Sequence, residues 1–172
     1  MNNRILVVYY SLEGNTQIIA ETIADETSGT LLALKPEKEI GTGFTKYLWG
    51  GSQVFMKKKP PLKPLEADPA DFDMLFIGTP VWAWTYAPPL ASFFHQASFQ
   101  HKRTALFCCH GGQKGKTLNH MRKQLTGNQV LGEIDFFDPL KKETKSSVQL
   151  ARRWAADIVK KAMESTDRIT NE

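Results

Sequence analysis

Short apolar runs alternate with amphipathic segments along most of the chain. The run Ile5–Tyr10 is continuous and rich in β-forming residues, which predicts a strand buried on both faces. From Thr16 to Ala24 the apolar residues recur at helical spacing, and Gly29 follows as a stop signal. The same patterns predict further strands at Thr30–Leu34, Met74–Ile77, Thr104–Cys109 and Val130–Phe137, and further helices near residues 90–97, 118–125 and 151–162.

This alternation of strands and helices predicts an α/β fold of the doubly wound class. Strands joined by right-handed helical crossovers form a parallel sheet with helices on both faces. The last strand carries Glu133 and Asp135 among its apolar residues, which favours an edge position. The stretch from Lys35 to Ala70 is the least regular: Phe44 to Phe55 suggests a helix broken near two glycines, followed by a proline-rich segment.

The length of 172 residues indicates one domain, expected over residues 1–164, with a polar C-terminal tail at 165–172. Hydrophobic residues make up 41% and charged residues 23%, an ordinary composition for a globular protein. No apolar run is long enough to span a bilayer, and no signal-peptide pattern follows Met1, so we expect a cytoplasmic protein without membrane insertion. Cys108 and Cys109 are adjacent, which disfavours a disulfide and predicts buried free thiols.

Charge and histidine placement argue against two other classes. The net charge of +4 is modest, and the basic run Lys57–Lys59 lies beside prolines rather than on a helix with aromatic readers, so no nucleic-acid partner is expected. A solvated loop is the favoured interpretation of that run, and a docking patch for an acidic protein is the alternative. His95, His101 and His120 form no ligand-spaced cluster, so we expect no metal site.

A ligand of an open α/β sheet binds beyond the carboxyl ends of the strands, which directs attention to three loops. The first loop, Ser11–Thr16, leads from a buried strand into a helix whose free N–H groups and dipole attract an anion. Side-chain donors on Ser11, Asn15 and Thr16 could complete a phosphate site without a lysine. The alternative is an ordinary N-cap in which Gly14 permits a tight turn.

The second loop, Thr79–Tyr86, places three large aromatic side chains where solvent-facing polar residues are usual. Trp82, Trp84 and Tyr86 either fold back into the core or form a platform for a planar ring system, and we favour the platform for at least one ring. Which of the three would stack on a ligand is left open.

The third loop, His110–Gly115, has glycines where a backbone could approach a ligand closely. A simple glycine-rich turn before a helix explains the same residues. His110 could donate to a ligand oxygen or lie in solvent.

The motif Tyr10-Ser-Leu-Glu-Gly-Asn-Thr16 resembles the FMN phosphate loop of the flavodoxin family, and the resemblance extends over nearly the whole chain. It implies a flavodoxin-like five-stranded sheet in the order 2-1-3-4-5 and FMN as the cofactor. It also implies three groups of cofactor-binding residues: Ser11, Glu13, Gly14, Asn15 and Thr16 around the phosphate; Thr79, Pro80, Val81 and Trp82, with Trp84 or Tyr86, beside the isoalloxazine; and His110, Gly111 and Gly112 at its pyrimidine side.

Two features depart from the family pattern. Glu13 stands where threonine is frequent, and a carboxylate repels a phosphate unless it points to solvent and only its N–H is used. The positive net charge differs from the acidic surface typical of flavodoxins, which bears on the identity of the partner more than on the cofactor.

Other phosphate motifs fit poorly. Gly115-Lys116-Thr117 ends like a Walker A loop, but His110 occupies the position of its first glycine. Gly41-Thr-Gly43 resembles a dinucleotide motif, but Lys46 replaces the third glycine and the motif follows the second strand.

Two functions of different classes therefore remain. The favoured one is an electron carrier between a reductase and an electron acceptor, expected as a monomer or weak dimer. The alternative is an FMN-dependent NAD(P)H oxidoreductase of the quinone-reductase type, for which Lys114 and Lys116 are the available cations for the nicotinamide phosphates. A binding protein that has lost its redox role is a third possibility, distinguished by whether a bound flavin can be reduced.

Overall fold

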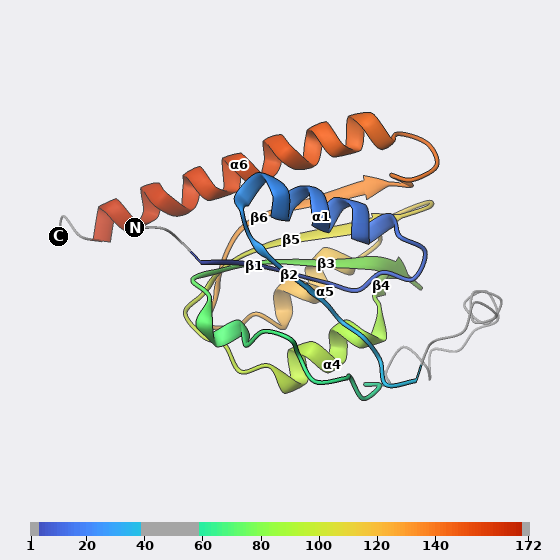
Figure 1. The fold of residues 1–172 in the computed structure, drawn as a ribbon, viewed down its shortest axis with the longest axis horizontal. Helices are drawn as coiled ribbons and strands as arrows, with labels where there is room; N and C mark the ends of the chain where they lie inside the picture. Colours follow the sequence, from blue (N-terminus) through green and yellow to red (C-terminus); the bar gives the residue numbers. More distant parts are fainter. Residues whose placement is uncertain (1–3, 39–58, 170–172) are drawn as a thin grey trace.

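A parallel sheet organises the computed structural model, which describes residues 4–38 and 59–169 (Figure 1). Its parallel strands lie in the order β2-β1-β3-β5-β6, and the short β4 pairs antiparallel with the end of β3. The strands are β1 (Ile5–Tyr9), β2 (Thr30–Ala33), β3 (Met74–Trp82), β4 (Thr85–Tyr86), β5 (Arg103–His110) and β6 (Gln129–Phe137). Among the parallel strands the order is 2-1-3-4-5, which confirms the predicted fold and the edge position of the last strand.

Helices cover both faces of this sheet. As Figure 1 shows, α1 (Asn15–Thr27) and α6 (Thr144–Ile169) lie on one face, and α4 (Pro88–Gln96) and α5 (Thr117–Lys123) lie on the other. Neighbouring residues of a strand point to opposite faces. Phe76 therefore belongs to the same core cluster as Ile23 of α1, whereas Leu75 belongs to a second cluster with Phe93 of α4. Burial on both sides explains the long apolar runs of the central strands, Ile5–Tyr9 in β1, residues 74–77 in β3 and residues 105–109 in β5.

The carboxyl end of β3, which borders the site, differs from the sequence prediction. The strand predicted to end at Ile77 continues to Trp82, and the predicted loop Thr79–Tyr86 is a β3–β4 hairpin. Its turn residues, Ala83 and Trp84, both have positive φ angles, 44° and 61°, as a type I′ turn requires. Glycine or asparagine usually fills such positions, so the sequence carried no hairpin signal here.

Three smaller points complete the fold. A 3₁₀ turn, η1 (Pro69–Asp71), precedes β3, and α6 continues past residue 164, where the sequence suggests that the domain ends. The helix expected between Phe44 and Phe55 lies outside the described residues. Within the described ranges, each helix is too short or too polar to cross a bilayer.

Candidate functional site

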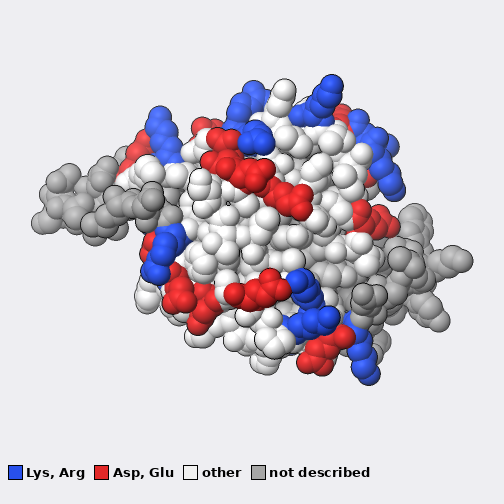
Figure 2. Space-filling model, viewed as in Figure 1, with Lys and Arg blue, Asp and Glu red and all other residues white. Residues whose placement is uncertain are grey.

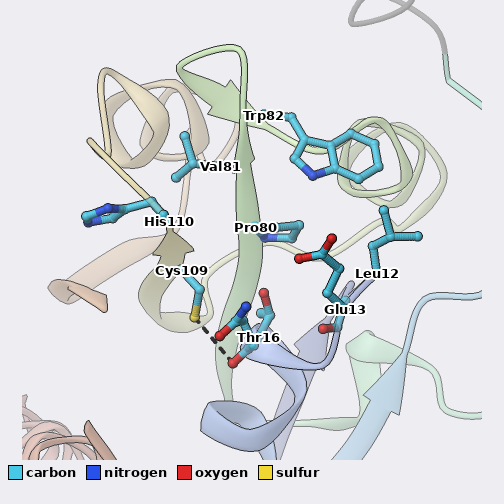
Figure 3. A pocket seen from close by; sticks show the side chains of 11 residues that line it. Leu12, Glu13, Thr16, Pro80, Val81, Trp82, Cys109 and His110 are labelled. Atoms are coloured by element: carbon cyan, nitrogen blue, oxygen red, sulfur yellow. Dashed lines mark hydrogen bonds between the residues drawn. The ribbon is translucent and has the colours of Figure 1, made fainter. Parts of the chain in front are cut away.

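A pocket of about 310 Å³ lies at the carboxyl edge of the sheet, where the β1–α1 loop, the end of β3 and the end of β5 meet (Figure 3). This volume is within the usual range for small-molecule sites. The residues that line it are Ser11, Leu12, Glu13, Asn15, Thr16, Pro80, Val81, Trp82, Cys109, His110 and Gly111. The pocket thus brings together most of the residues that the three loops predicted. Leu12 and Cys109 were not among the predicted site residues, and Gly14, Thr79, Trp84, Tyr86 and Gly112 do not line it.

The β1–α1 loop is shaped by a glycine at the start of the helix. Gly14 has φ 91°, and a β-carbon placed on it would lie 3.1 Å from Leu140 Cδ1, so both the backbone angle and the contact favour glycine. The Gly14 N–H donates to Ser11 Oγ at 3.1 Å, which leaves the Ser11 hydroxyl hydrogen available to a ligand. No acidic residue lies in the first turn of α1, and within residues 4–38 and 59–169 no side chain caps the start of the helix. The start of this helix is therefore suited to an anion.

Two side chains of the first turn strengthen this interpretation. Asn15 Oδ1 accepts the Leu140 N–H at 2.9 Å, which fixes the amide group and leaves its NH₂ as a donor. The Thr16 side chain is fully buried, and its hydroxyl oxygen has no hydrogen-bond partner that meets normal geometry among the described residues. A buried hydroxyl without a good partner is costly, and a ligand oxygen would satisfy it.

The neighbouring thiol does not replace that ligand. Cys109 Sγ lies close enough to Thr16 to interact with its hydroxyl, but it donates to the Asn15 carbonyl oxygen at 3.5 Å. Burial raises the pKa of the Cys109 thiol to about 12, and the contact with Thr16 offsets this only partly. Burial also raises the pKa of Cys108. Both cysteines are buried, protonated and free of a disulfide at neutral pH, as the sequence suggested.

Glu13, the residue that departs from the family motif, is exposed at the pocket wall. Figure 3 shows its side chain extending toward the Trp82 side of the pocket and away from Thr16. The carboxylate is thus separated from the Thr16 hydroxyl, and the repulsion of a phosphate bound at the helix start is reduced.

The three predicted aromatic residues occupy different environments. Trp82 lines the pocket, is 6% exposed and meets Tyr10 edge-on at 5.7 Å between ring centroids. Tyr86 is half-buried against Phe94, with 5.6 Å between ring centroids, and burial raises the pKa of its phenol. Trp84 is 66% exposed at the tip of the hairpin. Of the three rings, Trp82 is therefore the one placed to contact a ligand in this pocket.

The Thr79 side chain stabilises the base of the hairpin. Its hydroxyl accepts the Ala87 N–H at 3.0 Å and donates to the Pro80 carbonyl oxygen at 3.0 Å. The hydroxyl thus ties the two ends of the hairpin together, and the side chain is fully buried.

The β5–α5 loop differs from the expectation for His110. The imidazole neither contacts the centre of the pocket nor lies in solvent: it points away from Pro80 (Figure 3) and its Nε2 donates to Asp135 Oδ2 at 3.0 Å. A β-carbon placed on Gly111 or Gly112 would meet no atom of the described residues within 4 Å, so packing among them does not require glycine there. The open space over these residues can admit the edge of a ligand.

Comparisons with known proteins agree with this fold. Residues 4–145 match the family model described as Flavodoxin. A flavoprotein structure from Bacteroides eggerthii has 21% identity and a TM-score of 0.71, covering 91% of this chain and 98% of that one. A flavoprotein from Lactobacillus acidophilus, solved in complex with FMN, has 24% identity and a TM-score of 0.64, with 83% and 99% covered. A WrbA-like flavodoxin structure from Agrobacterium tumefaciens has 18% identity and a TM-score of 0.62, with 94% and 98% covered. At these identities the structures show the shared fold.

Proposed function

The chain belongs to the flavodoxin family, and from this membership and the geometry of the pocket we propose that it binds FMN and carries electrons between redox partner proteins. The observation that carries the proposal is the buried Thr16 hydroxyl in the first turn of α1, which has no good hydrogen-bond partner among the described residues. A phosphate there would accept from Thr16, from the Asn15 NH₂ and from the first N–H groups of the helix. The flavoprotein from Lactobacillus acidophilus, a structural neighbour solved with FMN, supports the same cofactor.

The remaining walls of the pocket suit the flavin end of that cofactor. Trp82 presents a large buried aromatic side chain, and the space over Gly111 is open. When bound, FMN supplies a centre that accepts and releases electrons. The protein's part is to hold the phosphate at Ser11–Thr16, to keep water from one side with Trp82, and to leave the outer edge accessible.

A carrier is favoured over a nicotinamide-dependent reductase because one of the two candidate cations is already engaged. Lys114 Nζ binds Asp135 Oδ1 at 2.7 Å, so it is not free to anchor a nicotinamide phosphate without breaking that pair. Lys116 is exposed and is the remaining candidate. The nicotinamide-dependent reductase is therefore the alternative that an experiment must test.

Partner docking would depend on the distribution of charge. On the face shown in Figure 2 acidic and basic side chains lie next to one another at several places, so neither sign covers the surface. Association with a charged redox partner should therefore be local and should weaken as salt rises.

Stopped-flow reduction of the FMN-loaded protein distinguishes the two functions. We expect NADH and NADPH alone to reduce the flavin slowly, whereas a flavin- or iron–sulfur-containing reductase should reduce it quickly at low ionic strength and more slowly at high. Fast, saturable reduction by a nicotinamide that is lost in Lys116→Ala but kept in Lys123→Ala, an exposed lysine at the other end of α5, would replace the carrier with an oxidoreductase.

A further inference from the structure

The loop Gly111–Gln113, beside the expected flavin end of the pocket, makes few contacts that could hold it in place. Gly111, Gly112 and Gln113 are exposed, and none of them makes a backbone hydrogen bond to a residue that the structure describes. No atom of the part of the chain that the structure describes lies within 4 Å of a β-carbon placed on either glycine. Three ordered residues cost about 1–2 kcal/mol each in backbone entropy, so a fixed loop of this kind needs an anchor.

A single carboxylate holds both ends of this loop. Asp135 Oδ2 accepts from His110 Nε2 at 3.0 Å, immediately before the loop, and Asp135 Oδ1 accepts from Lys114 Nζ at 2.7 Å, immediately after it. Asp135 lies on β6, and its Cα is in register with Cys108 of β5, so the sheet itself places the carboxylate beside the loop. The segment between His110 and Lys114 is thereby closed by one residue of another strand.

Partial burial strengthens the contacts that Asp135 makes with His110 and Lys114. The His110 side chain is 9% exposed and the Asp135 side chain 32%, which limits screening of their contact by water. Burial opposes ionisation of Asp135, but the hydrogen bonds from Lys114 and His110 outweigh it and lower the pKa of the carboxyl. The Lys114 side chain is 53% exposed, so water and salt screen its contact with Asp135 more than they screen the contact of His110.

The orientation of His110 separates this role from proton transfer inside the pocket. In Figure 3 the imidazole points away from Pro80. Its Nε2 lies 3.0 Å from Asp135 Oδ2. His110 contributes to the pocket as a lining residue, and its ring is used to tether the loop.

We propose that Asp135 is a positioning residue that holds the Gly111–Gln113 loop in place for the flavin end of the cofactor. This inference rests on the proposed binding of FMN. Asp135 lies outside the pocket lining, and its loss should weaken only the binding of the flavin end of the cofactor, because other contacts hold the Ser11–Thr16 loop.

The test compares Asp135→Asn with Glu133→Gln. Glu133 is a matched control: it lies on the same strand and accepts from Arg122 Nε at 2.8 Å, and no described hydrogen bond joins it to the loop. In titrations we expect Asp135→Asn to weaken FMN and riboflavin by the same factor, about fivefold, since an asparagine offers only one acceptor oxygen to the two donors. Glu133→Gln should leave both affinities unchanged. The flavin circular dichroism and the midpoint potential should shift in Asp135→Asn only.

A second measurement does not need the cofactor. Amide order parameters from ¹⁵N relaxation of the apoprotein should fall at Gly111 and Gly112 in Asp135→Asn and stay unchanged in Glu133→Gln. Should Asp135→Asn fail to fold, Lys114→Met removes one tether and should give the same pattern with a smaller loss.

Three results would overturn the inference: unchanged order parameters and affinities in Asp135→Asn, equal losses in Glu133→Gln, or a loss confined to FMN. A wild-type protein that binds neither flavin would instead refute the proposed function, while the order parameters of the apoprotein would still test the role of Asp135.

Discussion

Thr16→Val removes one buried hydroxyl and should move two properties in opposite directions. In the apoprotein the Thr16 oxygen is buried without a partner of normal geometry among the described residues, and such a group costs about 1–3 kcal/mol. The nearby Cys109 thiol compensates part of that cost, so we expect the variant to be more stable by about 1 kcal/mol. For a chain of this length that free energy raises the melting temperature by about 2–4 °C.

Binding of FMN should become weaker in the same variant. A hydrogen bond to a charged group contributes about 1.5–3 kcal/mol, which corresponds to a dissociation constant about 10-fold to 150-fold higher. Riboflavin lacks the phosphate, so its affinity should stay the same. Calorimetric titration of the apoprotein with both ligands, and thermal unfolding without ligand, measure the two effects.

Thr22→Val is the matched control on the same helix. The Thr22 side chain is also buried, but its hydroxyl donates to the Ile18 carbonyl oxygen at 2.7 Å. Its removal should give no gain in stability and no change in FMN affinity. A Thr16→Val apoprotein that is less stable than wild type, or that loses affinity equally for FMN and riboflavin, would refute the role given to this hydroxyl.

Further substitutions test other parts of the site and fold. Trp82→Ala should weaken the binding of both flavins and destabilise the apoprotein by about 3–5 kcal/mol, because it leaves a cavity in the core. Trp84→Gly should stabilise the apoprotein by about 1 kcal/mol, because it removes a side chain from left-handed backbone. Urea unfolding measures both changes in stability. Gly14→Ala should lower stability by about 1–3 kcal/mol and weaken FMN more than riboflavin, because φ is 91° and Leu140 lies 3.1 Å from the added carbon. The pKa of Asp135 is lower in the folded than in the unfolded protein, so its contribution to stability is present above the unfolded pKa near 3.9 and is lost as pH falls through the folded pKa. The difference in unfolding free energy between wild type and Asp135→Asn should therefore shrink below about pH 4. A difference that stays constant with pH would contradict this.

The sequence predicted the fold well because its signals were local. Uninterrupted apolar runs such as Ile5–Tyr10 indicate strands covered on both faces, and the loop from Ser11 to Thr16 carries the signal of an anion site at the start of a helix. The extension of β3 into a hairpin was missed because Ala83 and Trp84 adopt positive φ angles that their side chains do not favour.

The tertiary relations of the site were not predictable in the same way. Polar residues on the last strand indicated only an edge position, whereas Asp135 meets His110 and Lys114 because the register of β5 and β6 brings them together. The sequence left open which of Trp82, Trp84 and Tyr86 contacts a ligand for a similar reason: alternation along the chain does not show which ring a hairpin turns inward.

Titration of the wild-type apoprotein with FMN and with riboflavin tests the central claim most directly. We expect that one equivalent of FMN is bound, that its visible spectrum and fluorescence change on binding, and that FMN binds at least about 100-fold more tightly than riboflavin, since several charge-assisted hydrogen bonds reach the phosphate. Equal affinities for the two flavins, or a protein that takes up no FMN, would contradict the claim that the start of α1 and the Trp82 pocket together hold this cofactor.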